Sequence, residues 1–322
     1  MIDRILAYTS SYSRTFGINK AVDDLNHRNK KITDTIFLAG SARSGTTWLS
    51  ELFSEIPEYK LVFEPFHPVW FPDIIDMGVK YKPVLSNSDS HLLNYLHSVG
   101  EDCIRSTSPV FQFNNILKRL FASKVVVKSI RSHYVFPFIS QEINALGFYY
   151  IVRNPLAVIS SQIRTGYTGY TEFDGSNFVP SKKILHSLTE QIGLDQFSGV
   201  LKKANSDIEL LAYNWGLENW YVLNNLGSNI QIVKYESLVS DFYNEITNLL
   251  EPIEMTEWIE KVIQKRDRPS RSTNPRDINR VKKDGLKTNI DFTKKQRLSI
   301  INVIENFGVS LGSEPDGYSF DY

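Results

Sequence analysis

The sequence lacks several features that would each point to a class of protein. A single cysteine, Cys103, excludes an internal disulfide and a cysteine-based metal cluster. The 36 basic and 36 acidic residues cancel, which argues against broad electrostatic binding to nucleic acid or to an anionic membrane. No apolar run has the length of a membrane span or the form of a signal-peptide core. We therefore expect a cytoplasmic protein with no nucleic-acid partner and no integral-membrane segment.

The sequence does contain enough apolar material for an ordinary globular core. Hydrophobic residues make up 42% of the chain and aromatic residues 12%. A chain of 322 residues can hold one large α/β domain or two small ones. No repeat, low-complexity tract or clear linker divides it. We expect one domain over residues 1–322, with acceptor-side insertions near 67–121 and 165–205, and the oligomeric state stays open.

Short apolar runs alternate with helical patterns along most of the chain. Predicted buried strands lie within 36–39, 60–65, 123–131, 147–155 and 229–238. Helical spacing follows at 46–56 and at 155–164, where Pro155 suits a first helical turn. This alternation predicts an α/β fold of a P-loop-like, three-layer type, with a central, mainly parallel sheet flanked by helices.

The segment FLAGSARSGTTWL, residues 37–49, joins a predicted strand to a predicted helix and has the outline of a phosphate loop. Gly40 and Gly45 have the spacing of G-x-x-x-x-G-K-[ST], but Thr46 occupies the lysine position. The nearest cation is Arg43, inside the loop. A glycine loop that opens a helix presents backbone N–H groups and a positive dipole end to an anion. Further hydroxyl donors are expected from Ser41, Ser44, Thr46 and Thr47.

The ARSGTTW part of this loop resembles the 5'-phosphosulfate loop of the sulfotransferases that use 3'-phosphoadenosine 5'-phosphosulfate (PAPS). Arg43 stands at the cation position, and arginine there is more like the tyrosylprotein and carbohydrate branches than the cytosolic small-molecule branch. A second segment, YIVRNPLAVISS, resembles the family's 3'-phosphate motif, with Arg153 ending a strand and Ser161 following it. Both motifs occur in the family's order, each at a strand-to-helix junction.

The resemblance implies PAPS as the donor, adenosine 3',5'-bisphosphate (PAP) as the product, and no metal. The RPSRSTNPRDINRVKKDGL segment resembles the family's C-terminal loop, although a solvated basic loop is an equal alternative for Arg271, Ser272 and Lys283. Tyr235 and Glu236, in a YESL segment, are expected to serve packing and capping. The implied donor site comprises Arg43, Ser44, Gly45, Thr46, Thr47, Trp48, Arg153, Ser161, Arg271 and Ser272.

Transfer of a sulfuryl group depends on positioning and on a cation that offsets charge on the leaving oxygen. Arg43 and Lys128 are the candidates for that cation, since Lys128 ends a predicted strand where the family often has lysine. Glu64 is the first candidate for the base that takes the acceptor's proton, because the tyrosylprotein branch has its base at the same offset from the loop arginine. A salt bridge to an arginine is the alternative role for Glu64. His67 and His133 are the reserve candidates for the base.

The acceptor is the least defined part of the prediction. Aromatic side chains in the insertions are candidates for an acceptor pocket: Phe66, Trp70, Phe71, Tyr167, Tyr170 and Phe173. We expect a hydroxyl or amine of a small-molecule or glycan acceptor, with O- and N-sulfation both open. A nucleotide kinase or hydrolase with a degenerate loop and a catalytically silent nucleotide-binding protein are the alternatives. Tyr213 and Trp215 are candidates either for the core or for adenine stacking.

Overall fold

The computed structural model covers the central sheet and most of the helices around it. The described residues are 31–67, 71, 74, 82–84, 90–101, 118, 121–165, 181–270, 292–311 and 318–320. Several predictions therefore lie outside the described residues, namely those on Trp70, Tyr167, Tyr170, Phe173, Arg271, Ser272 and Lys283.

The central sheet has five strands in the order β2-β3-β1-β4-β5, and each neighbouring pair is parallel. The strands are β1 Ile36–Gly40, β2 Tyr59–Phe63, β3 Lys124–Ser129, β4 Gly147–Val152 and β5 Ile230–Lys234. Each strand overlaps an apolar run from which it was predicted. The predicted parallel sheet is therefore confirmed, and the apolar runs of β1, β3 and β4 reflect burial on both faces.

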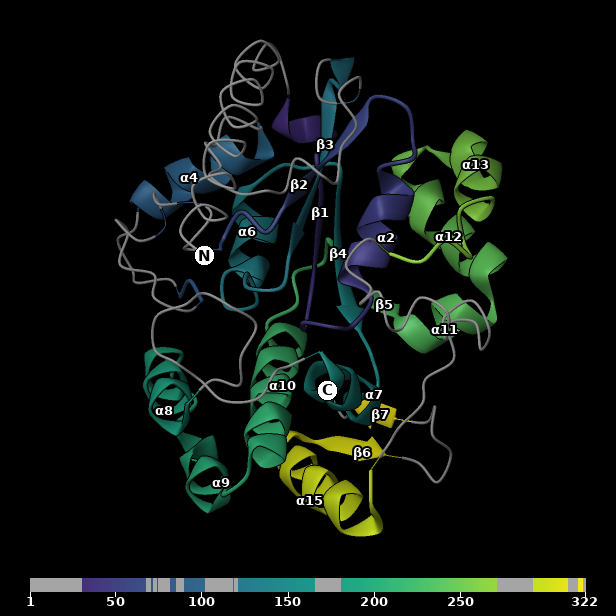
Figure 1. Cartoon of the computed structure of the whole chain (residues 1–322). Helices are drawn as coiled ribbons and strands as arrows, with labels where there is room; N and C mark the ends of the chain where they lie inside the picture. The colour runs from purple at the N-terminus through teal and green to yellow at the C-terminus, as the bar shows by residue number, and fades with distance from the viewer. Residues whose placement is uncertain are drawn as a thin grey trace, which may run out of the picture.

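Helices cover both faces of this sheet (Figure 1). One side carries α2 Thr46–Phe53, α11 Tyr235–Ser240, α12 Phe242–Leu250 and α13 Ile259–Ile263. The other side carries α4 Ser90–Gly100, α6 Phe136–Glu142, α7 Pro155–Arg164, α8 Lys182–Gln191, α9 Ser198–Lys203, α10 Asp207–Asn224 and α15 Lys294–Ile304. A short antiparallel pair, β6 Val309–Leu311 and β7 Tyr318–Phe320, follows α15. The three-layer arrangement agrees with the predicted fold class.

Alternation along the strands divides the core into two clusters. In β1, Ile36 and Leu38 pack in the cluster with α2 and α12, whereas Phe37 and Ala39 pack in the cluster with α4 and α10. All five residues of β1 are buried. Successive strand side chains point to opposite faces, so the central strand contributes to both apolar layers.

Two local features differ from what the sequence indicates. The segment FPFISQEINAL, residues 136–146, has a helical pattern in the sequence. The helix ends at Glu142, because Ile143 has an extended backbone and the chain then turns to bring Leu146 N to Thr35 O. The β6–β7 pair was not predicted. Among the described residues, no helix combines the length and apolar character needed to cross a membrane.

The carboxyl ends of the parallel strands bring the candidate residues to one edge of the sheet. The glycine loop follows β1, Glu64 follows β2, and Arg153 follows β4. Lys128 lies at the end of β3, in register with Phe63 of β2. In open α/β sheets, ligands bind at this edge, beside the strand where the order reverses. Here β1 holds that position, between β3 and β4.

Candidate active site

The surrounding structure requires glycine at two positions of the loop between β1 and α2. Gly45 has a φ of 99°, and a Cβ there would lie 2.5 Å from the ring of Tyr235. A Cβ on Gly40 would lie 2.5 Å from the carbonyl oxygen of Ile151. Any larger residue would have to displace these neighbours, so tight packing fixes the path of the loop.

The amino end of α2 retains donor groups that suit an anion. Gly45 is the N-cap and has no side chain with which to satisfy the first backbone N–H groups of the helix. Ser44 Oγ is buried and has no hydrogen-bond partner among the described residues. Thr46 and Thr47 open the helix and are buried as well. This set fits the phosphate-type group for which the sequence predicted the loop.

Arg43 joins the two predicted phosphate motifs. Its φ of 73° is in the left-handed region, which is uncommon for a non-glycine residue and occurs often at functional sites. Its Nε donates to Ser161 Oγ over 3.1 Å, and its carbonyl oxygen accepts a bond from Arg153 Nη1 over 3.1 Å. The loop after β1 and both members of the second motif therefore border the same site.

The YESL segment supports the turn that carries Arg153. The guanidinium of Arg153 lies 4.0 Å from the ring centroid of Tyr235, a stabilising cation–π contact. Glu236 Oε1 accepts a bond from Asn154 N over 3.0 Å, and Asn154 in turn caps α7 through Leu156 N at 2.9 Å. Tyr235 and Glu236 thus have the packing and capping contacts that the sequence led us to expect.

The other half of the site is a buried ion pair between the ends of β2 and β3. Lys128 Nζ binds Glu64 Oε1, and the two side chains are 3% and 2% exposed. Glu64 also accepts bonds from Arg131 Nη1 at 3.3 Å and from Ile130 N at 3.1 Å. Glu64 has a left-handed φ of 54°. The salt bridge considered for Glu64 therefore exists, and it includes the candidate cation Lys128.

Burial and charge act in opposite directions on this pair. Burial alone would raise the pKa of Glu64, but Lys128 and Arg131 outweigh it and hold that pKa below its ordinary value. Burial lowers the pKa of Lys128, and Glu64 offsets that effect only in part. The positive charges of Arg131 and Arg43 also lower the pKa of Lys128. Glu64 is therefore a carboxylate at neutral pH.

The two reserve histidines lie beside the pair. His133 is fully buried, with Nε2 3.0 Å from Ile130 O and Nδ1 2.9 Å from Tyr150 Oη. Since a carbonyl only accepts, Nε2 carries the proton and Nδ1 accepts from the tyrosine. Burial lowers the pKa of His133 to about 4. Both ring nitrogens of His133 thus have partners inside the protein, and His67 is buried with its backbone N bonded to Glu64 O at 2.9 Å.

Three charged residues at this edge escaped the sequence prediction. Arg131 contacts Glu64, and a buried pair between Lys82 and Glu218 lies on the side of α10. Ser41, expected as an anion donor, instead donates to Glu218 Oε2 over 2.5 Å. Of the three, only Arg131 could have been found from the sequence, because it ends the predicted strand segment that also contains Lys128.

The aromatic candidates that the structure describes are buried in the core clusters. Trp48 is 5% exposed, and its Nε1 donates to Arg266 O over 3.0 Å. Tyr213 and Trp215 are 0% and 1% exposed within the core cluster on the α10 side, so core packing is the role their position supports. Phe66 and Phe71 belong to the same buried cluster.

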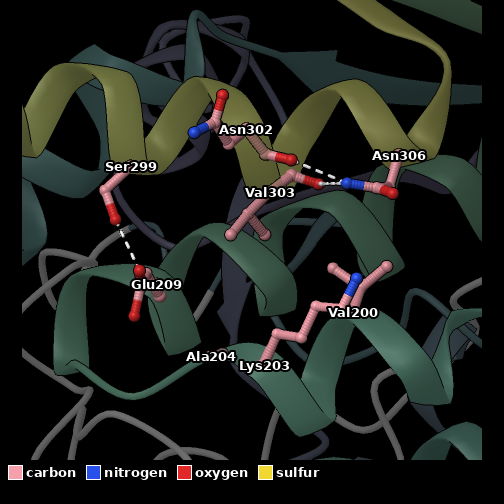
Figure 2. A pocket seen from close by; sticks show the side chains of 8 residues that line it. All are labelled: Val200, Lys203, Ala204, Glu209, Ser299, Asn302, Val303 and Asn306. Atoms are coloured by element: carbon pink, nitrogen blue, oxygen red, sulfur yellow. Dashed lines mark hydrogen bonds between the residues drawn. The ribbon is translucent and has the colours of Figure 1, made fainter.

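Two observations concern other kinds of site. Within the described part of the chain, no group of three or more His, Cys, Asp or Glu side chains is arranged to hold a metal ion. A pocket of about 290 Å³ lies between α9, α10 and α15, with Glu209 and Ser299 hydrogen-bonded on one wall (Figure 2). None of the predicted site residues lines it.

A glycine loop at the carboxyl edge of a parallel, three-layer sheet defines a P-loop-like α/β protein. Residues 33–299 match the family model described as the sulfotransferase domain. The chain therefore belongs to the sulfotransferase domain family, which confirms the resemblance seen in its two motifs and supports sulfotransferase activity. Its placement nearer the tyrosylprotein and carbohydrate branches stays a prediction.

Solved structures with overall similarity are sulfotransferases as well. The sulfotransferase domain from the curacin biosynthetic pathway is 15% identical, with 84% of this chain and 96% of that chain covered and a TM-score of 0.42. Mouse sulfotransferase SULT7A1, solved in complex with PAP, is 13% identical, with 89% and 88% covered and a TM-score of 0.44. A comparison with curated proteins found no match. The family assignment rests on the domain match.

Proposed function

We propose that this protein transfers the sulfuryl group of PAPS to a hydroxyl or amine of a small-molecule or glycan acceptor. The observation that carries the proposal is the contact of Arg43 with both Ser161 and Arg153. These residues come from two motifs far apart in the sequence, one for each phosphate of the same nucleotide. A cytoplasmic setting is part of the proposal.

The loop and the turn after β4 would hold the two ends of the donor. The N–H groups at the start of α2, Ser44 Oγ and the Arg43 guanidinium suit the phosphosulfate end. Arg153 and Ser161 suit the 3'-phosphate, because an arginine fork and a hydroxyl give charge-assisted bonds to phosphate oxygens. The Arg43–Ser161 bond would then give way to bonds with the donor.

Bound PAPS supplies an activated sulfuryl group whose bond to the phosphate oxygen breaks as a bond to the acceptor atom forms. Lys128 and Arg43 offset the negative charge that collects on that phosphate oxygen. Glu64 takes the proton from the acceptor, since its carboxylate is ionised and lies at the same sheet edge. Arg131 and Ile130 N hold the carboxylate in place.

Titration calorimetry with the full chain tests the donor. We expect PAP to bind, to bind equally well in a magnesium chelator, and to lose affinity when its 3'-phosphate is absent. Tighter binding of ATP with magnesium would refute the proposal in favour of a kinase or hydrolase.

Radiolabelled PAPS then tests the transfer. A panel of phenols, sugars, alcohols and amines would identify the acceptor class from the labelled product. Binding of PAP without transfer to any acceptor class would favour a catalytically silent nucleotide-binding protein. Loss of transfer in an Arg43→Ala variant, with the fold intact by circular dichroism, would support an enzyme.

A further inference from the structure

A second buried ion pair lies between α10 and the segment 82–84. Lys82 Nζ binds Glu218 Oε1, and each side chain is 3% exposed. Asn214, one turn earlier in α10, donates to the same oxygen over 2.6 Å. No step of the proposed transfer uses this pair. Because burying two charges is unfavourable unless their bonds are nearly complete, its presence beside the donor loop calls for an explanation.

The second oxygen of Glu218 is bound to the phosphate loop. Ser41 Oγ donates to Glu218 Oε2 over 2.5 Å, and His133 Nε2 lies 3.4 Å from the same atom. Asn219 Nδ2 donates to Ser41 Oγ over 3.0 Å. The Ser41 hydroxyl therefore donates a hydrogen bond to Glu218 and accepts one from Asn219, the next residue of α10.

Several separate segments meet on this one carboxylate. Glu218 accepts bonds from Asn214 of its own helix, from Lys82 of the acceptor-side insertion and from Ser41 of the phosphate loop. It also lies near His133, in the turn after β3. An ionised carboxylate has about four acceptor sites, so these neighbours account for its capacity. Fully satisfied buried networks hold their members in one arrangement.

We propose that Glu218 is a positioning residue of the donor site: it fixes the phosphate loop through Ser41, and Lys82 links this arrangement to the acceptor-side insertion. The inference rests on the proposed function, because it takes the loop as the place where the donor binds. Ser41 is the first residue after β1, so fixing its hydroxyl fixes the point from which the loop departs. A loop ordered beforehand loses less freedom when the donor binds.

Affinity of the full chain for PAP, measured by titration calorimetry, tests this role. The variants are Ser41→Ala, Lys82→Met and the two combined. Each single change is expected to weaken binding roughly fivefold to tenfold, because a bond to a charged group that orders the loop is lost. The combined variant is expected to have about the same PAP affinity as whichever single variant binds PAP less tightly, because both changes act through Glu218.

Steady-state kinetics give a second readout that a purely structural role would not move. The KM for PAPS is expected to rise by the same factor in each single variant, with kcat nearly unchanged, because the loop is less ordered before the donor binds. Glu218→Gln, where it folds, is expected to match Ser41→Ala. Where it does not fold, the Ser41–Lys82 pair of variants decides the question.

The same helix offers a matched control. Ser299 Oγ donates to Glu209 Oε1 over 2.5 Å near the start of α10, at the pocket away from the sheet edge (Figure 2). Ser299→Ala and Glu209→Gln remove a bond of the same kind and are expected to leave PAP affinity unchanged.

The behaviour of the wild-type protein separates this inference from the proposed function. A wild type that does not bind PAP would overturn both. A wild type that binds PAP, with Ser41→Ala and Lys82→Met binding equally well and only melting at lower temperature, would overturn this inference alone. A combined loss equal to the product of the single losses would overturn it too, because the two residues would then act independently.

Discussion

Replacing Lys128 by methionine tests the buried pair at the centre of the site. Methionine keeps most of the side-chain volume and removes the charge. Breaking a buried ion pair by removing one partner typically destabilises a protein by about 3–5 kcal/mol. Glu64 keeps Arg131 at 3.3 Å and Ile130 N at 3.1 Å, so we expect the lower end, about 3 kcal/mol. For a chain of 322 residues, that corresponds to a melting temperature lower by roughly 4–5 °C.

A double variant separates the stability of this pair from its chemistry. Glu64→Gln in the Lys128→Met background removes the charge left unpaired, so the free energy of unfolding is expected to recover in part. Transfer is not expected to recover, because loss of a group that stabilises transition-state charge typically lowers kcat by about 10²–10³. Thermal melting by circular dichroism and the release of PAP from PAPS measure the two effects.

Lys124→Met, in the same strand, is the control. Lys124 is 30% exposed and lies 3.5 Å from Glu58, which is 60% exposed. Such surface pairs contribute about 1 kcal/mol or less, so we expect a small change in melting temperature and unchanged transfer. A Lys128→Met protein with wild-type kcat would refute the catalytic role of Lys128. A double variant whose destabilisation equals the sum of both single variants would refute the coupling.

Three further predictions concern the loop, the second motif and His133. Gly45→Ala is expected to destabilise the fold by about 2–4 kcal/mol in a urea titration, because its Cβ would lie 2.5 Å from the Tyr235 ring at a φ of 99°. Arg153→Ala is expected to weaken PAP binding at least tenfold in calorimetry while affinity for adenosine 5'-phosphosulfate stays within about twofold; equal losses would contradict the assignment. Burial lowers the pKa of His133 from 6.5 to about 4, so between these pH values the unfolded chain binds a proton that the folded chain does not. The free energy of unfolding is therefore expected to fall as the pH drops from 6.5 to 4, by about 3 kcal/mol at most. In a His133→Gln variant, the melting temperature is expected to depend less on pH between 4 and 6.5.

The sheet, the loop and the start of α7 could be predicted because each depends on local pattern. β1 is apolar on both faces, and the two glycines that follow are needed where the loop meets Tyr235 and Ile151. α7 runs from Pro155 to Arg164 as expected, since Asn154 caps it and proline suits its first turn. Glu64 could be found as well, because it follows a strand whose end lies at the same edge as the loop.

Glu218 and Lys82 could not be predicted, because their pairing depends on contacts between distant segments. α10 is apolar around much of its circumference, with the consecutive residues Leu211, Ala212 and Tyr213 all buried, so its spacing does not show which face meets the loop. A glutamate on such a helix looks like a solvated charge. Lys82 lies in a stretch with no clear helical or strand period, and it meets Glu218 across 136 positions of sequence.

The distribution of charge explains how a neutral chain could bind the highly anionic donor that we propose. The whole protein has a formal net charge of zero, so its net charge would not attract the proposed donor. At the sheet edge, however, Arg43, Lys128, Arg131 and Arg153 are accompanied by the carboxylate of Glu64. Lys82 and Glu218 neutralise each other behind the loop. Among these residues, positive charges outnumber negative ones, and they are partly buried, where salt screens charges little. PAP affinity is therefore expected to depend on ionic strength less steeply than it would for a basic surface patch.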